Sequence, residues 1–190
     1  MRELVYYVAV SLDGFIAGPN GEFDAFDAEG DHMATIYDRY PELMPTAGAA
    51  ALGVDQSTKT VDTVVMGWNT YAVGLPFDMT SPYSHLRQIV FSRSHQAEGE
   101  NLVVTADDPV EVVRSLKAED GAGIWLCGGG SLAGQLVDEI DRLVLKVNPK
   151  LFGDGVPLFA GLDYRPRGFE PVVSTPHGSG VVIAEFARTR

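Results

Sequence analysis

Short apolar runs rich in β-branched residues recur along the chain, and each ends in a glycine or a polar residue. Such runs are typical of strands that are buried on both faces of a sheet. They cover residues 3–12, 61–66, 88–91, 101–105, 124–127 and 142–147. Helix-forming segments lie between several of them. The sequence therefore predicts an α/β fold of three layers, with a mostly parallel central sheet and helices on both faces.

Two helices can be placed from local signals. Residues 31–40 favour a helix that stops before Pro41. A clearer helix begins at Asp108, an N-cap residue that is followed by Pro109 at the first helical position. Residues 41–59 are rich in Ala, Gly and Thr and fit either a loop or a weak helix.

The C-terminal region predicts two more strands, at 169–174 and 181–187. Because no helical segment separates them, we expect an antiparallel hairpin at one edge of the sheet. The chain has 190 residues, no internal repeat and no linker-like stretch, so we expect a single domain over 1–190.

Composition narrows the classes of partner. The formal net charge of −12 argues against binding to nucleic acid or to anionic membrane surfaces. No apolar stretch approaches the roughly 20 residues that span a bilayer. The first residues show no secretory pattern, and Cys127 is the single cysteine, so we expect a cytoplasmic protein that acts on a small molecule.

Four polar or glycine-rich segments directly follow predicted strands. In a parallel sheet the carboxyl ends of the strands share one edge, where ligands bind. Glycine N–H groups and helix N-termini at such an edge suit a phosphate. Strand-to-helix junctions in any α/β protein also use glycine, so this pattern alone is still compatible with glycines that serve only the turns. The segments are Asp13-Gly14, Gly67-Trp68-Asn69-Thr70, Ser92-Arg93-Ser94 and Gly128-Gly129-Gly130-Ser131.

Other motif-based readings are weaker. Residues 128–133 (GGGSLA) match the glycine pattern of a Rossmann dinucleotide site, but they lie two-thirds along the chain and no acidic residue follows at the expected distance. The four histidines show no metal-ligand spacing, so no metal site is predicted. Neither a serine-hydrolase elbow nor a P-loop is present.

Five segments together resemble the dihydrofolate reductase superfamily, most closely the branch related to the reductase domain of the riboflavin-biosynthesis deaminase–reductase. They occur in the family order and span nearly the whole chain. The segments are SLDGFIA at 11–17, VVMGWNTY at 64–71, IVFSRS at 89–94, WLCGGGSL at 125–132 and NPKLFGDGVPLF at 148–159.

The resemblance implies a dihydrofolate reductase-like fold with a cleft for NADPH, and a homodimer formed through the C-terminal edge strands. In such reductases, the segment matching Gly67 to Thr70 holds the pyrophosphate and the segment matching Ser92, Arg93 and Ser94 holds the 2′-phosphate. The glycine segment often contains a cis Gly–Gly bond. The residues implied to contact the nicotinamide side are Gly128, Gly129, Gly130, Ser131 and Leu132 with Ala9, Val10 and Ile16. Two positions depart from the family: Trp68 replaces a common Arg or Lys, and Cys127 replaces a Glu.

A proton donor is harder to assign. Reduction of a C=N bond needs a proton besides the hydride. Among the acidic residues after the first loop, at positions 24, 27, 29 and 31, Asp31 has the best spacing, although an N-cap or surface role also fits it. Asp13 fits either substrate positioning or an Asp-Gly turn.

We therefore predict an NADPH-dependent reductase that transfers a hydride to a pteridine-like or pyrimidine-like heterocycle. A diaminopyrimidine ribosylphosphate reductase of riboflavin synthesis is the alternative enzyme, and its substrate phosphate would need a cation such as Lys59 or Arg165. A nucleotide-binding protein that has the fold without turnover remains a third reading.

Overall fold

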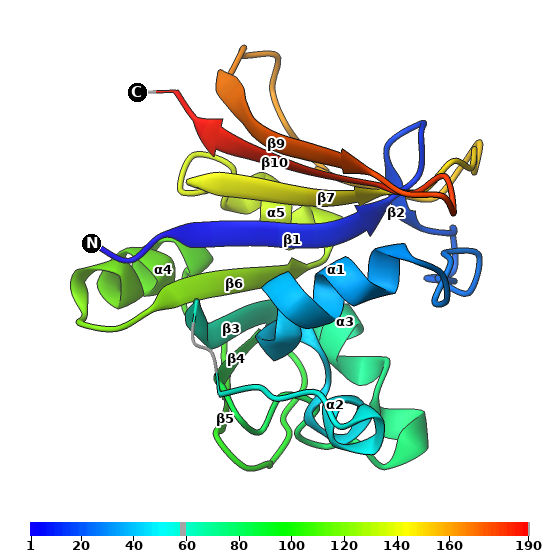
Figure 1. The fold of residues 1–190 in the computed structure, drawn as a ribbon. Helices are drawn as coiled ribbons and strands as arrows, with labels where there is room; N and C mark the ends of the chain where they lie inside the picture. The colour runs from blue at the N-terminus through cyan, green and yellow to red at the C-terminus, as the bar shows by residue number, and fades with distance from the viewer. Residues whose placement is uncertain (58–59, 190) are drawn as a thin grey trace.

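The computed structural model describes residues 1–57 and 60–189, which are arranged around an eight-stranded sheet (Figure 1). The strand order is β5-β4-β3-β6-β1-β7-β10-β9. The strands are β1 (Leu4–Val10), β3 (Val61–Gly67), β4 (Arg87–Phe91), β5 (Leu102–Thr105), β6 (Gly123–Gly128), β7 (Arg142–Val147), β9 (Phe169–Pro176) and β10 (Val182–Arg188). Neighbouring strands from β5 to β7 run parallel, whereas β10 runs antiparallel to β7 and to β9. The predicted parallel sheet with an antiparallel edge hairpin is confirmed.

Helices cover both faces of this sheet (Figure 1). One face carries α1, whose Ile36 packs against Val144 and Ile183. The other face carries α4 and α5, whose Val113 and Leu132 join a different core. The helical elements are α1 (His32–Arg39), η1 (Pro41–Leu43), α2 (Thr46–Leu52), α3 (Trp68–Ala72), η2 (Leu75–Phe77), α4 (Pro109–Ala118) and α5 (Gly130–Gln135).

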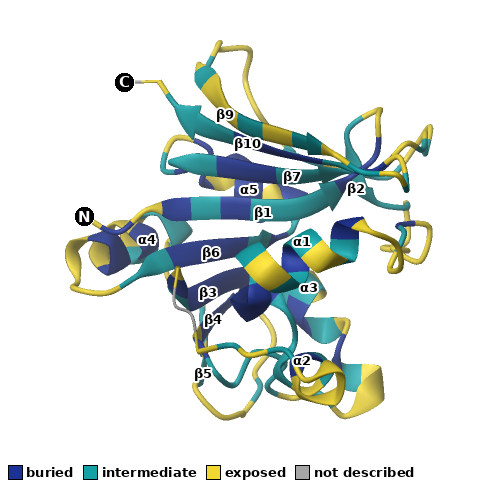
Figure 2. Cartoon of the chain, in the orientation of Figure 1, coloured by how far each residue is buried: buried dark blue, intermediate teal, exposed yellow. Residues whose placement is uncertain are grey.

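The central strands separate two apolar cores. Successive side chains of a strand point to opposite faces, and on β3 Val64 and Val65 accordingly belong to different cores. Both side chains are fully buried, and Figure 2 shows that most of β3, β4 and β6 is buried as well. Burial on both faces explains why these strands read as continuous apolar runs.

The structure differs from the prediction at several short elements. The first strand ends at Val10, and Phe15–Ala17 forms a separate strand, β2, which pairs with β8 (Val156–Pro157). Elements this short give no sequence periodicity, so β8 was missed. The ambiguous segment 41–59 contains η1 and α2 in its described part. None of the described helices is both long and apolar enough to cross a membrane.

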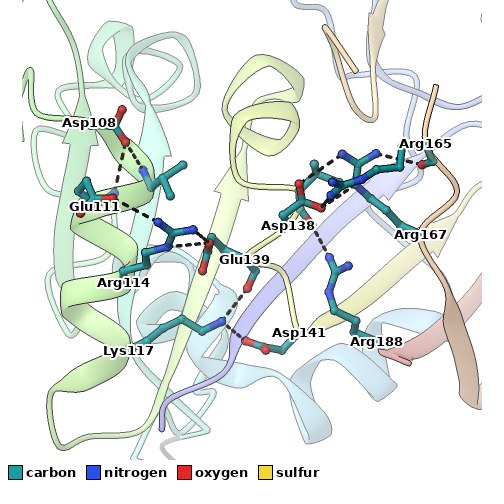
Figure 3. Close-up of polar contacts among 12 residues, drawn as sticks. Asp108, Glu111, Arg114, Lys117, Asp138, Glu139, Asp141, Arg165, Arg167 and Arg188 are labelled. Atoms are coloured by element: carbon teal, nitrogen blue, oxygen red, sulfur yellow. Dashed lines mark hydrogen bonds and ion pairs between the residues drawn. The ribbon is translucent and has the colours of Figure 1, made fainter. Parts of the chain in front are cut away.

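Charged side chains attach α4 to the amino-terminal edge of the sheet (Figure 3). The Nζ atom of Lys117 lies 2.6 Å from an Asp141 carboxylate oxygen and donates a hydrogen bond to the Glu139 carbonyl at 2.7 Å. The same Asp141 oxygen accepts a hydrogen bond from the Leu4 N–H at 2.7 Å. Lys117 therefore connects α4 to the start of β1 through one buried ammonium group.

We expect Lys117→Met to lower the free energy of unfolding by about 1–3 kcal/mol, because it keeps the apolar stem but removes the cation paired with Asp141 and the donor to the Glu139 carbonyl. Arg114→Met is the matched control. Arg114 also lies on α4 and pairs with Glu139, but its side chain is 59% exposed, so the loss should stay below about 1 kcal/mol. Urea unfolding measures both values, and equal losses would contradict the assignment.

Candidate functional site

Strand register brings three of the predicted ligand-binding segments together. Met66 of β3 pairs with Gly128 of β6, and Gly67 pairs with Phe91 of β4. All three strands run in the same direction. The residues that follow them therefore emerge side by side at the carboxyl edge of the sheet, where open α/β sheets bind ligands.

These segments line one continuous cleft of about 1400 Å³. That volume exceeds the usual range of a small-ligand pocket and is sufficient for a dinucleotide together with a second ring. The predicted residues that line it are Ile16, Gly67, Trp68, Asn69, Thr70, Ser92, Arg93, Ser94, Gly128, Gly129, Gly130, Ser131 and Leu132. The cleft is long, and its two ends differ in chemistry.

The β5 end of the cleft, which we define by residues 92–95 and 105–109, carries polar groups. The hydroxyl oxygen of Ser92 accepts hydrogen bonds from the N–H groups of His95 at 2.9 Å and Ser94 at 3.4 Å. This turn leaves the Arg93 side chain exposed beside two serines. The imidazole of His95 stacks on Trp68, with ring centroids 4.5 Å apart and planes at 9°.

Within the glycine segment, Gly130 approaches neighbouring backbone too closely for any side chain. A Cβ atom on Gly130 would lie 2.0 Å from the carbonyl oxygen of Pro157 in β8. The Gly130 carbonyl itself accepts a hydrogen bond from the Ala160 N–H at 2.9 Å. The peptide bond between Gly128 and Gly129 is cis, as the family resemblance implied. Gly130 begins α5, and the first N–H groups of a helix have no acceptor within it, so they are available to a ligand.

The β1 end of the cleft is apolar, and we define it by Val8, Ile16, Phe23, Tyr83, Cys127 and Val156. Cys127 and Tyr83 both line it, with the Cys127 sulfur 3.9 Å from the Tyr83 phenol oxygen. Burial raises the pKa of the Cys127 thiol to about 12. Burial also raises the pKa of Tyr83 well above its usual value, and the neighbouring Cys127 adds a smaller shift in the same direction. Both groups are therefore neutral at physiological pH.

Two residues expected at the nicotinamide side do not line the cleft. Val10 is buried, and Ala9 points to the opposite face of β1 from Val8, the β1 residue that does line it. A contact of Ala9 or Val10 with a nicotinamide stays a prediction. Because successive side chains of β1 point to opposite faces, the side chain of Val8 lines the cleft and that of its neighbour Ala9 does not.

Asp13 lies outside the lining of the cleft and holds two loops together. Its carboxylate accepts hydrogen bonds from the Ser11 hydroxyl at 2.6 Å and from the N–H groups of Phe152 and Gly153 at 3.1 and 2.7 Å. These donors lower the pKa of Asp13 to about 2. The carboxylate thus fixes the loop after β1 against the loop before β8, and a direct role on a substrate stays a prediction.

Asp31 also lies outside the lining. It occupies the N-cap position of α1 but makes no capping hydrogen bond there. Its carboxylate instead accepts hydrogen bonds from Gly178 at 2.6 Å and Ser179 at 3.0 Å, in the turn between β9 and β10. These two N–H groups lower the pKa of Asp31 to about 2, so it is ionised at neutral pH. An ionised carboxylate away from the cleft does not favour the predicted role of proton donor.

Several lining residues were missed at the sequence level. Thr105 to Pro109 follow β5 at the same edge, and the N-cap signal at Asp108 could have added this segment as another strand-end break. Tyr83 and His95 gave no local signal, because only the fold brings them to Cys127 and Trp68. Among residues 1–57 and 60–189, no three His, Cys, Asp or Glu side chains are grouped to hold a metal ion.

Comparison with known proteins agrees with this geometry. The family model described as the RibD C-terminal domain matches residues 2–183. The uncharacterised protein YwjB of Bacillus subtilis is 31% identical over 164 residues, which cover 83% of each chain.

Solved structures show the same fold. A protein from Shewanella sp. PV-4, named for riboflavin biosynthesis, has a TM-score of 0.71 at 24% identity and full coverage of both chains. The Thermotoga maritima deaminase and 5-amino-6-(5-phosphoribosylamino)uracil reductase has a TM-score of 0.68 at 16% identity, over 99% of this chain and 57% of the other. Dihydrofolate reductase of Enterococcus faecalis, complexed with NADP(H), has a TM-score of 0.64 at 16% identity, over 99% of this chain and 97% of the other.

The Asp31 contacts predict a pH dependence of stability. Because the pKa falls from 3.8 to about 2 on folding, the ionised carboxylate stabilises the protein above about pH 4, and this contribution is lost as the pH falls toward 2. Asp31→Asn should therefore be less stable than the wild type at neutral pH, and the difference should shrink between pH 4 and 2. Urea midpoints across this range measure it, with the exposed Asp24→Asn as control. A pH-independent difference would refute the assignment.

Proposed function

This chain belongs to the RibD C-terminal domain family, a family of riboflavin-pathway-type reductases, and from that premise we propose that it is an NADPH-dependent reductase. The acceptor of the hydride is a pteridine-like or pyrimidine-like heterocycle. The structurally similar Thermotoga protein is named as a 5-amino-6-(5-phosphoribosylamino)uracil reductase, which supports a pyrimidine. The dihydrofolate reductase of the same fold supports a pteridine.

The observation that carries this proposal is the convergence of three strand-end segments on one cleft. Residues 67–70 and 128–132 offer backbone N–H groups that glycine leaves accessible, together with the Thr70 and Ser131 hydroxyls, and such donors suit a pyrophosphate. Arg93 between two serines suits a 2′-phosphate, since a guanidinium forms paired hydrogen bonds with phosphate oxygens. The residues present therefore fit NADPH, and Arg93 accounts for a preference over NADH.

The protein's part in the reaction is to bind and orient. A bound reduced nicotinamide supplies the hydride. The close contact of Gly130 with the Pro157 carbonyl fixes the glycine segment at the middle of the cleft, and the apolar β1 end offers surface on which the acceptor ring can be oriented. Since Tyr83 and Cys127 hold their protons tightly, the acceptor nitrogen takes its proton from a water molecule.

We expect NADPH to quench tryptophan fluorescence in a saturable way, because Trp68 lines the cleft. Arg93→Ala should weaken NADPH binding about 10- to 100-fold, the loss of a charge-assisted contact, and should leave NADH binding nearly unchanged. Arg87→Ala is the matched control, since it removes the same charge from the opposite end of β4. The absence of a saturable quench, or equal effects of the two variants, would remove the reductase proposal. Saturable binding without turnover of any heterocycle would favour the reading as a nucleotide-binding protein.

A homodimer is also proposed, through the edge formed by β9 and β10. In the described sheet β9 pairs with β10 alone, and its Val172 is 52% exposed. An apolar residue on a free edge is a candidate contact between copies. Light scattering should give twice the 20.5 kDa chain mass, and Val172→Lys should shift the mass toward the monomer. A wild-type mass of one chain would overturn this proposal.

A further inference from the structure

Charge is distributed unevenly along the cleft. Arg93 is the one Lys or Arg among the described residues that line it, and it lies at the β5 end. The two lining carboxylates, Asp107 and Asp108, lie at the same end. At the β1 end the lining groups are apolar or neutral, because Tyr83 and Cys127 keep their protons there.

Two lysines at and after the end of β7, Lys146 and Lys150, bind groups outside the cleft. The Nζ atom of Lys146 donates a hydrogen bond to the Asp27 carbonyl at 3.1 Å. Lys150 pairs with the Asp27 carboxylate at 2.7 Å and donates a hydrogen bond to the Ala25 carbonyl at 2.6 Å. Neither lysine lines the cleft. Both ammonium groups hold the loop that precedes α1, so neither is free to meet an anionic substrate.

The sequence suggested two cations for a substrate phosphate, Lys59 and Arg165, and the structure describes only Arg165. Arg165 pairs with Asp138 at 2.6 Å (Figure 3) and does not line the cleft. Lys59 lies outside the described residues.

From these observations we propose that the β1 end of the cleft binds an uncharged planar ring, without a phosphate or a carboxylate tail. This inference rests on the proposed reductase function and specifies its substrate class. An anion placed there would lose its hydration and gain no cation in return, which is unfavourable in an apolar site. The net charge of −12 further lowers the local concentration of anions.

An aromatic ring, in contrast, has complementary neighbours. Phe23 and Tyr83 offer ring surfaces, while Val8, Ile16 and Val156 offer aliphatic ones. In the balanced reaction the hydride of NADPH forms the new C–H bond at the carbon of a C=N group. The nitrogen gains one proton from water, and NADP⁺ is released.

Binding to the complex with NADP⁺ tests the inference without requiring turnover. We would titrate that complex by calorimetry with two matched pairs. The first pair is 5-amino-6-(5-phosphoribosylamino)uracil and the same compound without its phosphate. The second pair is dihydrofolate and a dihydropterin that lacks the glutamate. In at least one pair the uncharged member should bind, and it should bind at least about tenfold more tightly than its charged partner.

A variant that adds charge provides the reverse test. Phe23 is 53% exposed in a loop, so a lysine can be accommodated there. Compared with Phe23→Gln, we expect Phe23→Lys to strengthen binding of the phosphorylated pyrimidine about fivefold, as a partly exposed ion pair would, with little change for the unphosphorylated one.

The outcomes are distinct. Equal or tighter binding of the charged member in both pairs overturns the inference, and so does the absence of saturable binding by either uncharged member. A failure of the reductase proposal itself is detected separately, as the absence of NADPH binding or of its dependence on Arg93.

Discussion

In the parallel register Met66 lies opposite Gly128 and Gly67 lies opposite Phe91, which places the ends of β3, β4 and β6 at one level. Three segments that are far apart in the sequence therefore meet as neighbours at the carboxyl edge of the sheet. A shift of one residue would turn each strand's side chains to the other core, so burial on both faces keeps the register fixed. The cleft and its glycine backbone both depend on this alignment.

The order of strands also explains why the cleft has two chemical ends. The segments after β4 and β5 contribute Ser92, Arg93 and the start of α4, which are polar groups suited to phosphates. The segments associated with β1 and β6 contribute Val8, Ile16 and Cys127. Under the proposed function, a charged ligand group would bind at the β5 end and the reacting ring would meet apolar surface at the β1 end.

The two acidic residues selected from the sequence have hydrogen-bond partners that local patterns could not indicate. Asp13 and Asp31 have the residue type and spacing of catalytic groups, yet each accepts backbone N–H groups from loops more than 130 positions away. Their hydrogen bonds stabilise the arrangement of loops around the sheet. Spacing along the chain carries no information about such distant donors, so only the tertiary structure could assign this role.

The sequence by itself determined the long buried strands, the capped helix at Asp108, the antiparallel edge hairpin and three segments, at residues 67–70, 92–94 and 128–132, that line the cleft. These features depend on local patterns, because two-sided burial, helix capping and the close approach of backbone each demand particular residues at particular positions. Only the tertiary structure decided the short pairing of β2 with β8, the choice of Val8 over its neighbours, and the contact of Tyr83 with Cys127. The physical reason is that these contacts join segments distant in sequence, whose meeting is set by sheet register and not by local pattern.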